Sequence, residues 1–163
     1  MIGITGPPGA GKSTLTNRLI QNYRKKNLSV AVLAVDPSSP FTGGAVLGDR
    51  IRMQEHALDD GVFIRSIGSR GDLGGLSSAT SAIIKLFDSF GMDIVLIETV
   101  GVGQTELDII KISDCVLVTL VPEAGDGVQA MKAGLMEIGD IFIVNKADRG
   151  GAEKLAREID YMI

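Results

Sequence analysis

The sequence has one cysteine, Cys115, and one histidine, His56, among its 163 residues. A single cysteine excludes an intrachain disulfide, and one histidine with one distant cysteine cannot form the His/Cys cluster that a transition-metal carrier needs. We expect Cys115 to pack in the core, because it opens the apolar run 115–121. His56 falls in a predicted helix, where we expect a surface or half-buried residue.

Long apolar stretches and basic clusters are also lacking. No apolar run reaches the roughly 20 residues that span a bilayer, and no signal peptide precedes the first run, which predicts a cytoplasmic protein. The 16 Lys and Arg residues are outnumbered by 20 Asp and Glu, for a net charge of −4. We therefore expect neither nucleic-acid nor membrane binding.

Short apolar runs alternate with helical patterns along the whole chain, which predicts an α/β fold. The runs of strand length cover 2–5, 30–35, 62–67, 94–97, 115–121 and 141–144. The helical patterns cover roughly 12–27, 48–60, 76–90, 105–113, 128–138 and 151–162. We expect one domain over residues 1–163, with a mostly parallel sheet of about six strands, helices on both faces, and ligands at the carboxyl ends of the strands.

A glycine-rich loop follows the first apolar run, where residues 6–13 read GPPGAGKS. In this strand–loop–helix order the glycines let successive backbone N–H groups turn toward one anion. Lys12 brings a mobile positive charge to the β- and γ-phosphates, and Ser13 brings a hydroxyl to Mg²⁺ at the first helical turn. The motif predicts a nucleoside-triphosphate site made by Gly6, Pro8, Gly9, Ala10, Gly11, Lys12, Ser13 and Thr14.

The choice of base depends on residues 145–148, which read NKAD directly after the last apolar run. In this pattern the carboxylate of Asp148 accepts hydrogen bonds from two guanine donors, whereas adenine would present a lone pair to it. Leaving such a buried group unpaired costs about 1–3 kcal/mol, which is enough to favour GTP over ATP. We expect Asn145 to brace the loop and the stem of Lys146 to lie along guanine.

Three carboxylates near strand ends are candidate Mg²⁺ ligands. Asp36 ends the second run, and Glu98 ends the fourth in E-T-V-G, where most GTPases carry D-x-x-G. Asp49 is explained equally well as a helix N-terminal acid that the macrodipole favours. The backbone amide of Gly101 is expected to sense the γ-phosphate.

The group that orients the attacking water is left open by the sequence. Many GTPases have a glutamine directly after the D-x-x-G glycine, but Val102 holds that position here and the glutamine is Gln104. Gln104 either positions the water after a loop rearrangement or caps the following helix. Together with Lys12, Glu98 and Gly101 it forms the candidate catalytic set, and we expect slow hydrolysis without a partner.

Five segments resemble, in this order, the MeaB/ArgK family of P-loop GTPases, which includes the methylmalonic aciduria type A protein. They read GPPGAGKST, VDPSSPFTGGAVLGDRIRM, ETVGVGQTE, PEAGDGVQAMKAG and NKAD. The resemblance implies an Mg²⁺-dependent GTPase that acts as a chaperone for adenosylcobalamin-dependent methylmalonyl-CoA mutase, gating cofactor loading and protecting the enzyme. It also implies that Asp49 joins Asp36 and Glu98 around the metal, and that 122–132 is a third switch that signals to the mutase.

The chain differs from the family in two expected features, and two other functions remain as alternatives. Family members usually carry an N-terminal helical extension and a C-terminal arm that builds a dimer; we expect both to be absent here, so a homodimer stays open. A nickel-delivery GTPase of the same superclass is disfavoured by the missing His/Cys cluster. A P-loop kinase or an ATPase associated with amino-acid transport is disfavoured by 145–148, because neither needs to select guanine.

Overall fold

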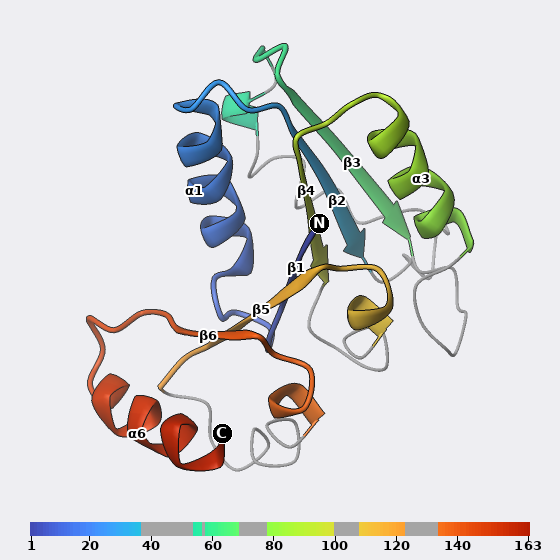
Figure 1. Ribbon diagram of the computed structural model, residues 1–163. Coiled ribbons are helices and arrows are strands. Elements are labelled where there is room, and N and C mark those ends of the chain that lie inside the picture. Colours follow the sequence, from blue (N-terminus) through green and yellow to red (C-terminus); the bar gives the residue numbers. More distant parts are fainter. Residues whose placement is uncertain (37–53, 57, 69–77, 100–107, 123–133) are drawn as a thin grey trace.

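Six strands form one parallel sheet, and helices cover both of its faces (Figure 1). The computed structural model describes residues 1–36, 54–56, 58–68, 78–99, 108–122 and 134–163. Within these ranges the strands are β1 (Ile2–Thr5), β2 (Val30–Asp36), β3 (Val62–Gly68), β4 (Ile94–Thr99), β5 (Cys115–Leu120) and β6 (Ile141–Val144). The helices are α1 (Lys12–Arg24), α3 (Ser78–Ser89) and α6 (Ala152–Met162), with 3₁₀ turns η1 (Gln54–His56) and η2 (Ile109–Lys111). The predicted α/β fold is confirmed.

The strand order is β3-β2-β4-β1-β5-β6, which places β1 inside the sheet between β4 and β5. Ile4 of β1 pairs with Glu98 of β4, and Thr5 pairs with Val118 of β5, all in parallel register. The carboxyl ends of β1 and β4 therefore lie next to each other. Because ligands of parallel sheets bind outside the carboxyl ends of the strands, this register determines which loops meet at a site.

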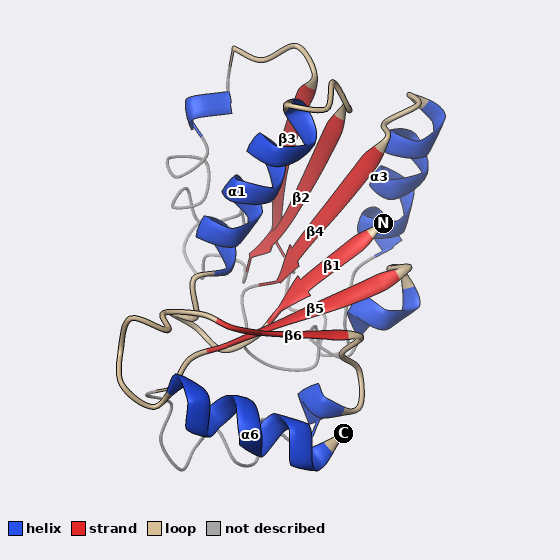
Figure 2. Cartoon of the chain, turned by 60° about the vertical axis from the view of Figure 1, so that its left-hand side comes forward, coloured by secondary structure: helices blue, strands red, loops and turns tan. Residues whose placement is uncertain are grey.

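Alternate residues of β2 face opposite layers of the molecule. Val30 and Val32 pack in one cluster with Ile20 of α1, whereas Leu33 packs in another with Phe87 of α3. Figure 2 accordingly shows α1 and α3 on opposite sides of the sheet. A strand covered on both faces reads as a continuous apolar run, which explains why Val-Ala-Val-Leu-Ala-Val carries no polar alternation.

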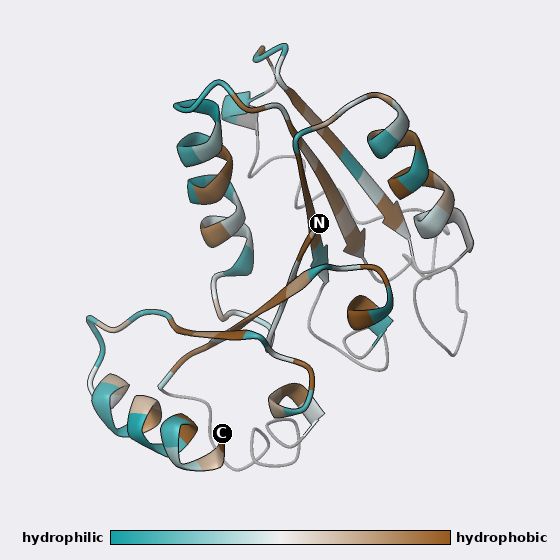
Figure 3. Cartoon of the chain, in the orientation of Figure 1, coloured by the Kyte–Doolittle hydropathy of each residue, from teal (hydrophilic) through white to brown (hydrophobic). Residues whose placement is uncertain are grey.

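The last helix and the last two strands share a third cluster. Leu155 and Ile159, four residues apart on α6, are both 5% exposed and pack with Val118 and Leu120 of β5. The opposite side of α6 carries charged residues such as Lys154 and Glu158. Figure 3 shows this two-sided hydropathy on α1 and α6, beside strands that are mostly hydrophobic. Burial of one stripe is what holds such a helix on a sheet.

Helix α1 ends at a defined turn rather than continuing to residue 27 as the pattern predicts. Asn27 has a φ of 58°, its N–H donates to the Arg24 carbonyl (2.9 Å), and the Leu28 N–H donates to Tyr23 (3.2 Å). This paired arrangement is a Schellman motif, which satisfies carbonyls that the helix leaves open. Asparagine suits it because it tolerates the left-handed conformation better than most residues.

One expectation about local structure is corrected, and two others fall partly outside the described residues. The helix predicted over 48–60 contains, in its described part, only the 3₁₀ turn η1 followed by non-helical residues. Of the patterns 105–113 and 128–138, the structure describes only 108–113, with a helical residue at 108 and the 3₁₀ turn η2, and 134–138, with a helical turn at 134–136.

The burial of the one histidine and the one cysteine also differs from expectation. His56 is only 8% exposed, because its ring contacts the side-chain oxygen of Asn17 on α1. Cys115 is half-buried at the start of β5 rather than packed in the core.

Candidate nucleotide-binding site

The loop between β1 and α1 requires glycine at two positions for steric reasons. Gly6 has a φ of 136°, and a Cβ there would lie 2.1 Å from the Thr119 carbonyl oxygen. Gly11 has a φ of 90°, and its Cβ would lie 2.3 Å from Nδ2 of Asn145. Side chains cannot be added at either place without moving β5 or the loop after β6. The loop thus delivers the first turn of α1, with its free N–H groups, to the carboxyl edge of the sheet.

The Lys12 side chain is buried, with 6% of it exposed. Its Nζ donates hydrogen bonds to the carbonyl oxygens of Gly6 (2.8 Å) and Pro7 (3.0 Å), both in the loop itself. These bonds offset the cost of burying an ammonium group. The cation is therefore held at the loop that would receive the phosphates, as its position in the motif predicts.

Both oxygens of Glu98 accept hydrogen bonds from hydroxyl groups of α1. Ser13 Oγ donates to Oε1 (2.6 Å), and Thr16 Oγ1 lies 2.7 Å from Oε2. Glu98 is 5% exposed and Thr16 is fully buried. The pairing of β1 with β4 brings the carboxylate to the helix, so two of the predicted metal ligands, Ser13 and Glu98, lie in direct contact.

Thr16 was not among the residues predicted from the sequence. The available signal was its spacing, because residues three apart on a helix lie on the same face, and Ser13 was already a candidate ligand. A second threonine contact stiffens the same edge: Thr99 Oγ1 donates to Thr5 Oγ1 (3.0 Å), and both residues are at most 1% exposed. Hydroxyl groups from β1, α1 and β4 therefore surround this part of the site.

A hydroxyl and a carboxylate in contact are oxygen donors of the kind that Mg²⁺ prefers, so Ser13 and Glu98 fit this ion. Asp36 ends β2 one position after the Val35–Thr99 pair, at the same edge of the sheet. The described residues contain no group of three or more His, Cys, Asp or Glu side chains that could hold a metal by themselves.

Asn145 connects the end of β6 to the phosphate loop. Its side-chain Nδ2 donates to the Ala10 carbonyl (2.8 Å), and its backbone N–H donates to Leu120 of β5 (2.8 Å). The next residue, Lys146, has a φ of 54°, which turns the chain sharply at the strand end. Asp148 follows in an exposed position. The loop expected to bind guanine is therefore joined to the loop expected to bind phosphate.

The remaining members of the two motifs differ in exposure. Ala10 is fully buried, whereas Pro8, Gly9 and Thr14 are exposed. Four predicted features lie outside the described residues: Asp49, Gly101, Gln104 and segment 123–132, and the side chain of Asp36 is likewise outside the description. The structure thus brings together the P-loop, Glu98 and Asn145 from the candidate site.

The 3₁₀ turn η1 fastens the chain to α1 just after residues 37–53. Glu55 accepts hydrogen bonds from Asn17 Nδ2 (2.7 Å) and Gln21 Nε2 (3.2 Å), and His56 contacts the Asn17 side-chain oxygen. These contacts anchor one end of the segment that contains Asp49 to the helix that begins at the P-loop.

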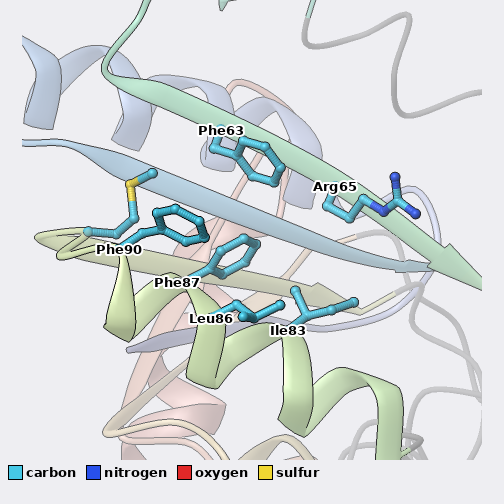
Figure 4. A pocket seen from close by; sticks show the side chains of 7 residues that line it. Phe63, Arg65, Ile83, Leu86, Phe87 and Phe90 are labelled. Carbon is cyan, nitrogen blue, oxygen red and sulfur yellow. The ribbon is translucent and has the colours of Figure 1, made fainter.

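An apolar groove of about 400 Å³ lies away from this edge, between β3 and α3 (Figure 4). It is lined by Phe63, Arg65, Ile83, Leu86, Phe87, Phe90 and Met92. None of these residues belongs to the predicted nucleotide site. Within the described part of the chain, no helix is both long and apolar enough to cross a membrane.

Comparison with known proteins identifies relatives that match most of this chain. A GTPase-named protein of Pyrococcus horikoshii is 63% identical over 153 residues, which cover 94% of this chain and 48% of the relative. The mouse protein named methylmalonic aciduria type A homolog, mitochondrial, is 42% identical over 147 residues, or 90% of this chain and 35% of the mouse chain. The chain thus spans about half of one relative and a third of the other.

A solved structure and a family model agree with these relatives. The crystal structure of an LAO/AO transport system kinase superposes with a TM-score of 0.71 at 30% identity, covering 99% of this chain and 45% of that one. The family described as methylmalonyl Co-A mutase-associated GTPase MeaB matches residues 1–163. The chain therefore belongs to the MeaB family of P-loop GTPases.

Proposed function

We propose that this chain binds GTP together with Mg²⁺ and hydrolyses it to GDP and phosphate. The contact between Ser13 and Glu98 at the start of α1 supports the proposal most directly, because a hydroxyl and a carboxylate side by side next to the phosphate loop are oxygen donors of the kind that Mg²⁺ prefers. Membership of a GTPase family supports the same assignment.

Different residues would bind the phosphates, the metal and the base. The loop N–H groups and Lys12 would bind the phosphates, with Lys12 exchanging its carbonyl partners for phosphate oxygens. Bound Mg²⁺ would neutralise charge that develops on the transferred phosphoryl group. Ser13 and Glu98 would hold that ion, and Asn145 would keep the phosphate and base loops together. Without a partner we expect about 10⁻⁴–10⁻² s⁻¹, the range of unassisted GTPases.

Guanine selectivity is tested by Asp148→Asn, which replaces an acceptor oxygen with an NH₂ donor. Calorimetry should give weaker GDP binding and stronger binding of xanthosine diphosphate, because the carbonyl at position 2 of xanthine accepts where the guanine amino group donates. The unsubstituted chain should prefer GTP to ATP. Equal affinities for the two triphosphates would contradict the guanine assignment.

The metal shell is tested by Asp36→Ala. Because Asp36 ends a strand at a loop entrance, the variant should fold normally but require more Mg²⁺ for tight nucleotide binding and hydrolysis. Titration of GDP with and without Mg²⁺ separates an effect on metal binding from an effect on nucleotide binding. An unchanged Mg²⁺ requirement would remove Asp36 from the proposed ligands, while the contact of Ser13 with Glu98 would be tested separately through Glu98→Gln.

The proposed client is an adenosylcobalamin-dependent methylmalonyl-CoA mutase, whose cofactor loading and protection the GTPase would gate. The support is the description of the matching family and the name of the mouse relative. Segment 122–132 is the proposed contact, because its two glycines and two carboxylates at the end of β5 make ordering costly unless a partner binds.

The client proposal is tested with a purified mutase. Replacing both Asp126 and Lys132 by alanine should leave GDP affinity unchanged but abolish mutase-stimulated hydrolysis, whereas the unsubstituted chain should be stimulated. Full stimulation of the double variant would refute the switch. Light scattering of the same samples would test for a homodimer.

A further inference from the structure

The hydroxyl of Thr16 contacts the carboxylate of Glu98 in addition to a backbone carbonyl of its own helix. Its Oγ1 lies 2.7 Å from Glu98 Oε2 and 3.0 Å from the carbonyl oxygen of Lys12, one helical turn earlier. A hydroxyl has one proton and donates it to one acceptor at a time. The carbonyl alone would satisfy Thr16, so the contact with Glu98 is not needed to bury the threonine.

The contact matters for Glu98 because glutamate has one more rotatable bond than the aspartate common at this position. A longer side chain has more conformations to lose when its carboxylate is fixed, which costs free energy unless contacts hold it. Ser13 holds Oε1 at 2.6 Å and Thr16 holds Oε2 at 2.7 Å. A hydrogen bond to each oxygen restricts the orientation of the carboxylate more than a hydrogen bond to one oxygen does.

The two hydroxyls differ in what a metal would do to them. Ser13 is the predicted metal ligand, so its bond to Oε1 would be exchanged when an ion binds. Thr16 lies one turn deeper in α1 and is fully buried, so its bond to Oε2 would remain. The second contact can therefore continue to hold Glu98 after Ser13 has exchanged its own bond.

We propose that Thr16 is a positioning residue that holds the carboxylate of Glu98 in its metal-binding orientation and so raises the affinity of the nucleotide complex for the divalent ion. The inference rests on the proposed Mg²⁺-dependent nucleotide binding and adds a residue outside the P-loop motif to it. It makes no use of base recognition or of a client protein.

The test measures metal affinity directly, by titrating the GDP complex with Mn²⁺ and following the free ion by electron paramagnetic resonance. Thr16→Val keeps the shape of the side chain and removes the hydroxyl, so affinity for Mn²⁺ should fall about tenfold, the size of one hydrogen bond to a charged group. Thr16→Ser should restore it. GDP affinity in EDTA should change less than about twofold in both variants.

Thr119→Val is the matched control. Thr119 is also a fully buried threonine, but its hydroxyl has no hydrogen-bond partner among the described residues. It should retain normal Mn²⁺ affinity. If Thr16→Val does not fold, Thr16→Ala provides a second hydroxyl-free variant, and thermal unfolding of all variants separates loss of folding from loss of metal.

A double-mutant cycle with Glu98→Asp decides whether Thr16 acts through Glu98. The shorter carboxylate cannot keep both contacts, so adding Thr16→Val to Glu98→Asp should cause little further loss. Full additivity, or normal Mn²⁺ affinity in Thr16→Val, would overturn the inference. If the unsubstituted GDP complex binds no Mn²⁺, the proposed Mg²⁺-dependent function itself fails, which is a different outcome from an additive cycle.

Discussion

The Asn145 amide joins two residues that are 135 positions apart in the sequence, since it donates to the carbonyl of Ala10 in the phosphate loop. The same side chain lies where a Cβ at Gly11 would be, only 2.3 Å from Nδ2. The side chain of Asn145 can therefore lie here only because residue 11 is a glycine and has no Cβ. Through this contact, the motif that is expected to recognise the base can influence the phosphate loop.

Replacing Asn145 by alanine should weaken GDP binding about tenfold and lower the free energy of unfolding by about 0.5–1.5 kcal/mol, because one interloop hydrogen bond is lost. Calorimetry and urea unfolding measure the two effects. Asn145→Asp should bind GDP more weakly still, because a carboxylate oxygen would face the Ala10 carbonyl. GDP affinity that survives both substitutions would show that the loops do not depend on this bond.

Part of the site could be predicted because spacing alone determines it. Lys12 and Ser13 follow a glycine loop after a strand, and the structure places both at the start of α1. Thr16 was not predicted, because its contact depends on the neighbouring strand being β4 as well as on the extra length of Glu98. The glutamate and the helical spacing of Thr16 from Ser13 can be read from the sequence, but the neighbouring strand cannot.

At the scale of elements, a charged pair locks the end of α1 to the turn before β3. Arg24 Nη2 lies 2.9 Å from Asp59 Oδ1, and Arg24 Nε also donates to this carboxylate. The side-chain hydrogen bond from Arg24, followed by the backbone hydrogen bond from Gly61, lowers the pKa of Asp59 below 3.8. The pair raises the pKa of Arg24 in return.

This pair predicts a dependence of stability on pH. A carboxyl group whose pKa is lowered by folding stabilises the native state above its ordinary pKa, and this contribution is lost as pH falls through the lowered value. Asp59→Asn should therefore be less stable than the unsubstituted chain near neutral pH, and the difference should shrink below about pH 4. Urea unfolding at several pH values measures it, and a constant difference would contradict the assignment.

The strands and the helices α1, α3 and α6 were predicted well, whereas the described part of the helical pattern 48–60 was not. The strands and helices α1, α3 and α6 lie where expected, with α1 shortened by the turn at Asn27. The pattern at 48–60 predicted a helix, but hydrogen bonds from Asn17 and Gln21 to Glu55 hold η1 against α1 as a single 3₁₀ turn. Tertiary contacts decide such segments, because a few residues gain little from their own helical bonds.

At the scale of the whole molecule, the strand order explains the composition of the site. β1 contacts β4 on one side and β5 on the other, so the phosphate loop receives Glu98 from one neighbour and, through β5 and β6, Asn145 from the other. Alternation of strands and helices predicts a parallel sheet but not this order, because each crossover can pass either way along the sheet. The joining of distant motifs is thus a property of topology.

The same topology predicts that side chains in the central strands contribute most to the free energy of unfolding. A leucine in the sheet and a leucine on a helix test this prediction. Leu96 lies fully buried in β4 between Ile20 and Val32, whereas Leu86 on α3 is 55% exposed at the apolar groove. Leu96→Ala should lower the free energy of unfolding by about 2–5 kcal/mol, since it opens a cavity in the centre of the sheet. Leu86→Ala makes the same chemical change on a surface that is already solvated, so it should cost about 0.5 kcal/mol. Urea unfolding of both variants measures the two losses of unfolding free energy. Equal losses would mean that the groove contributes as much to stability as the core between α1 and β4.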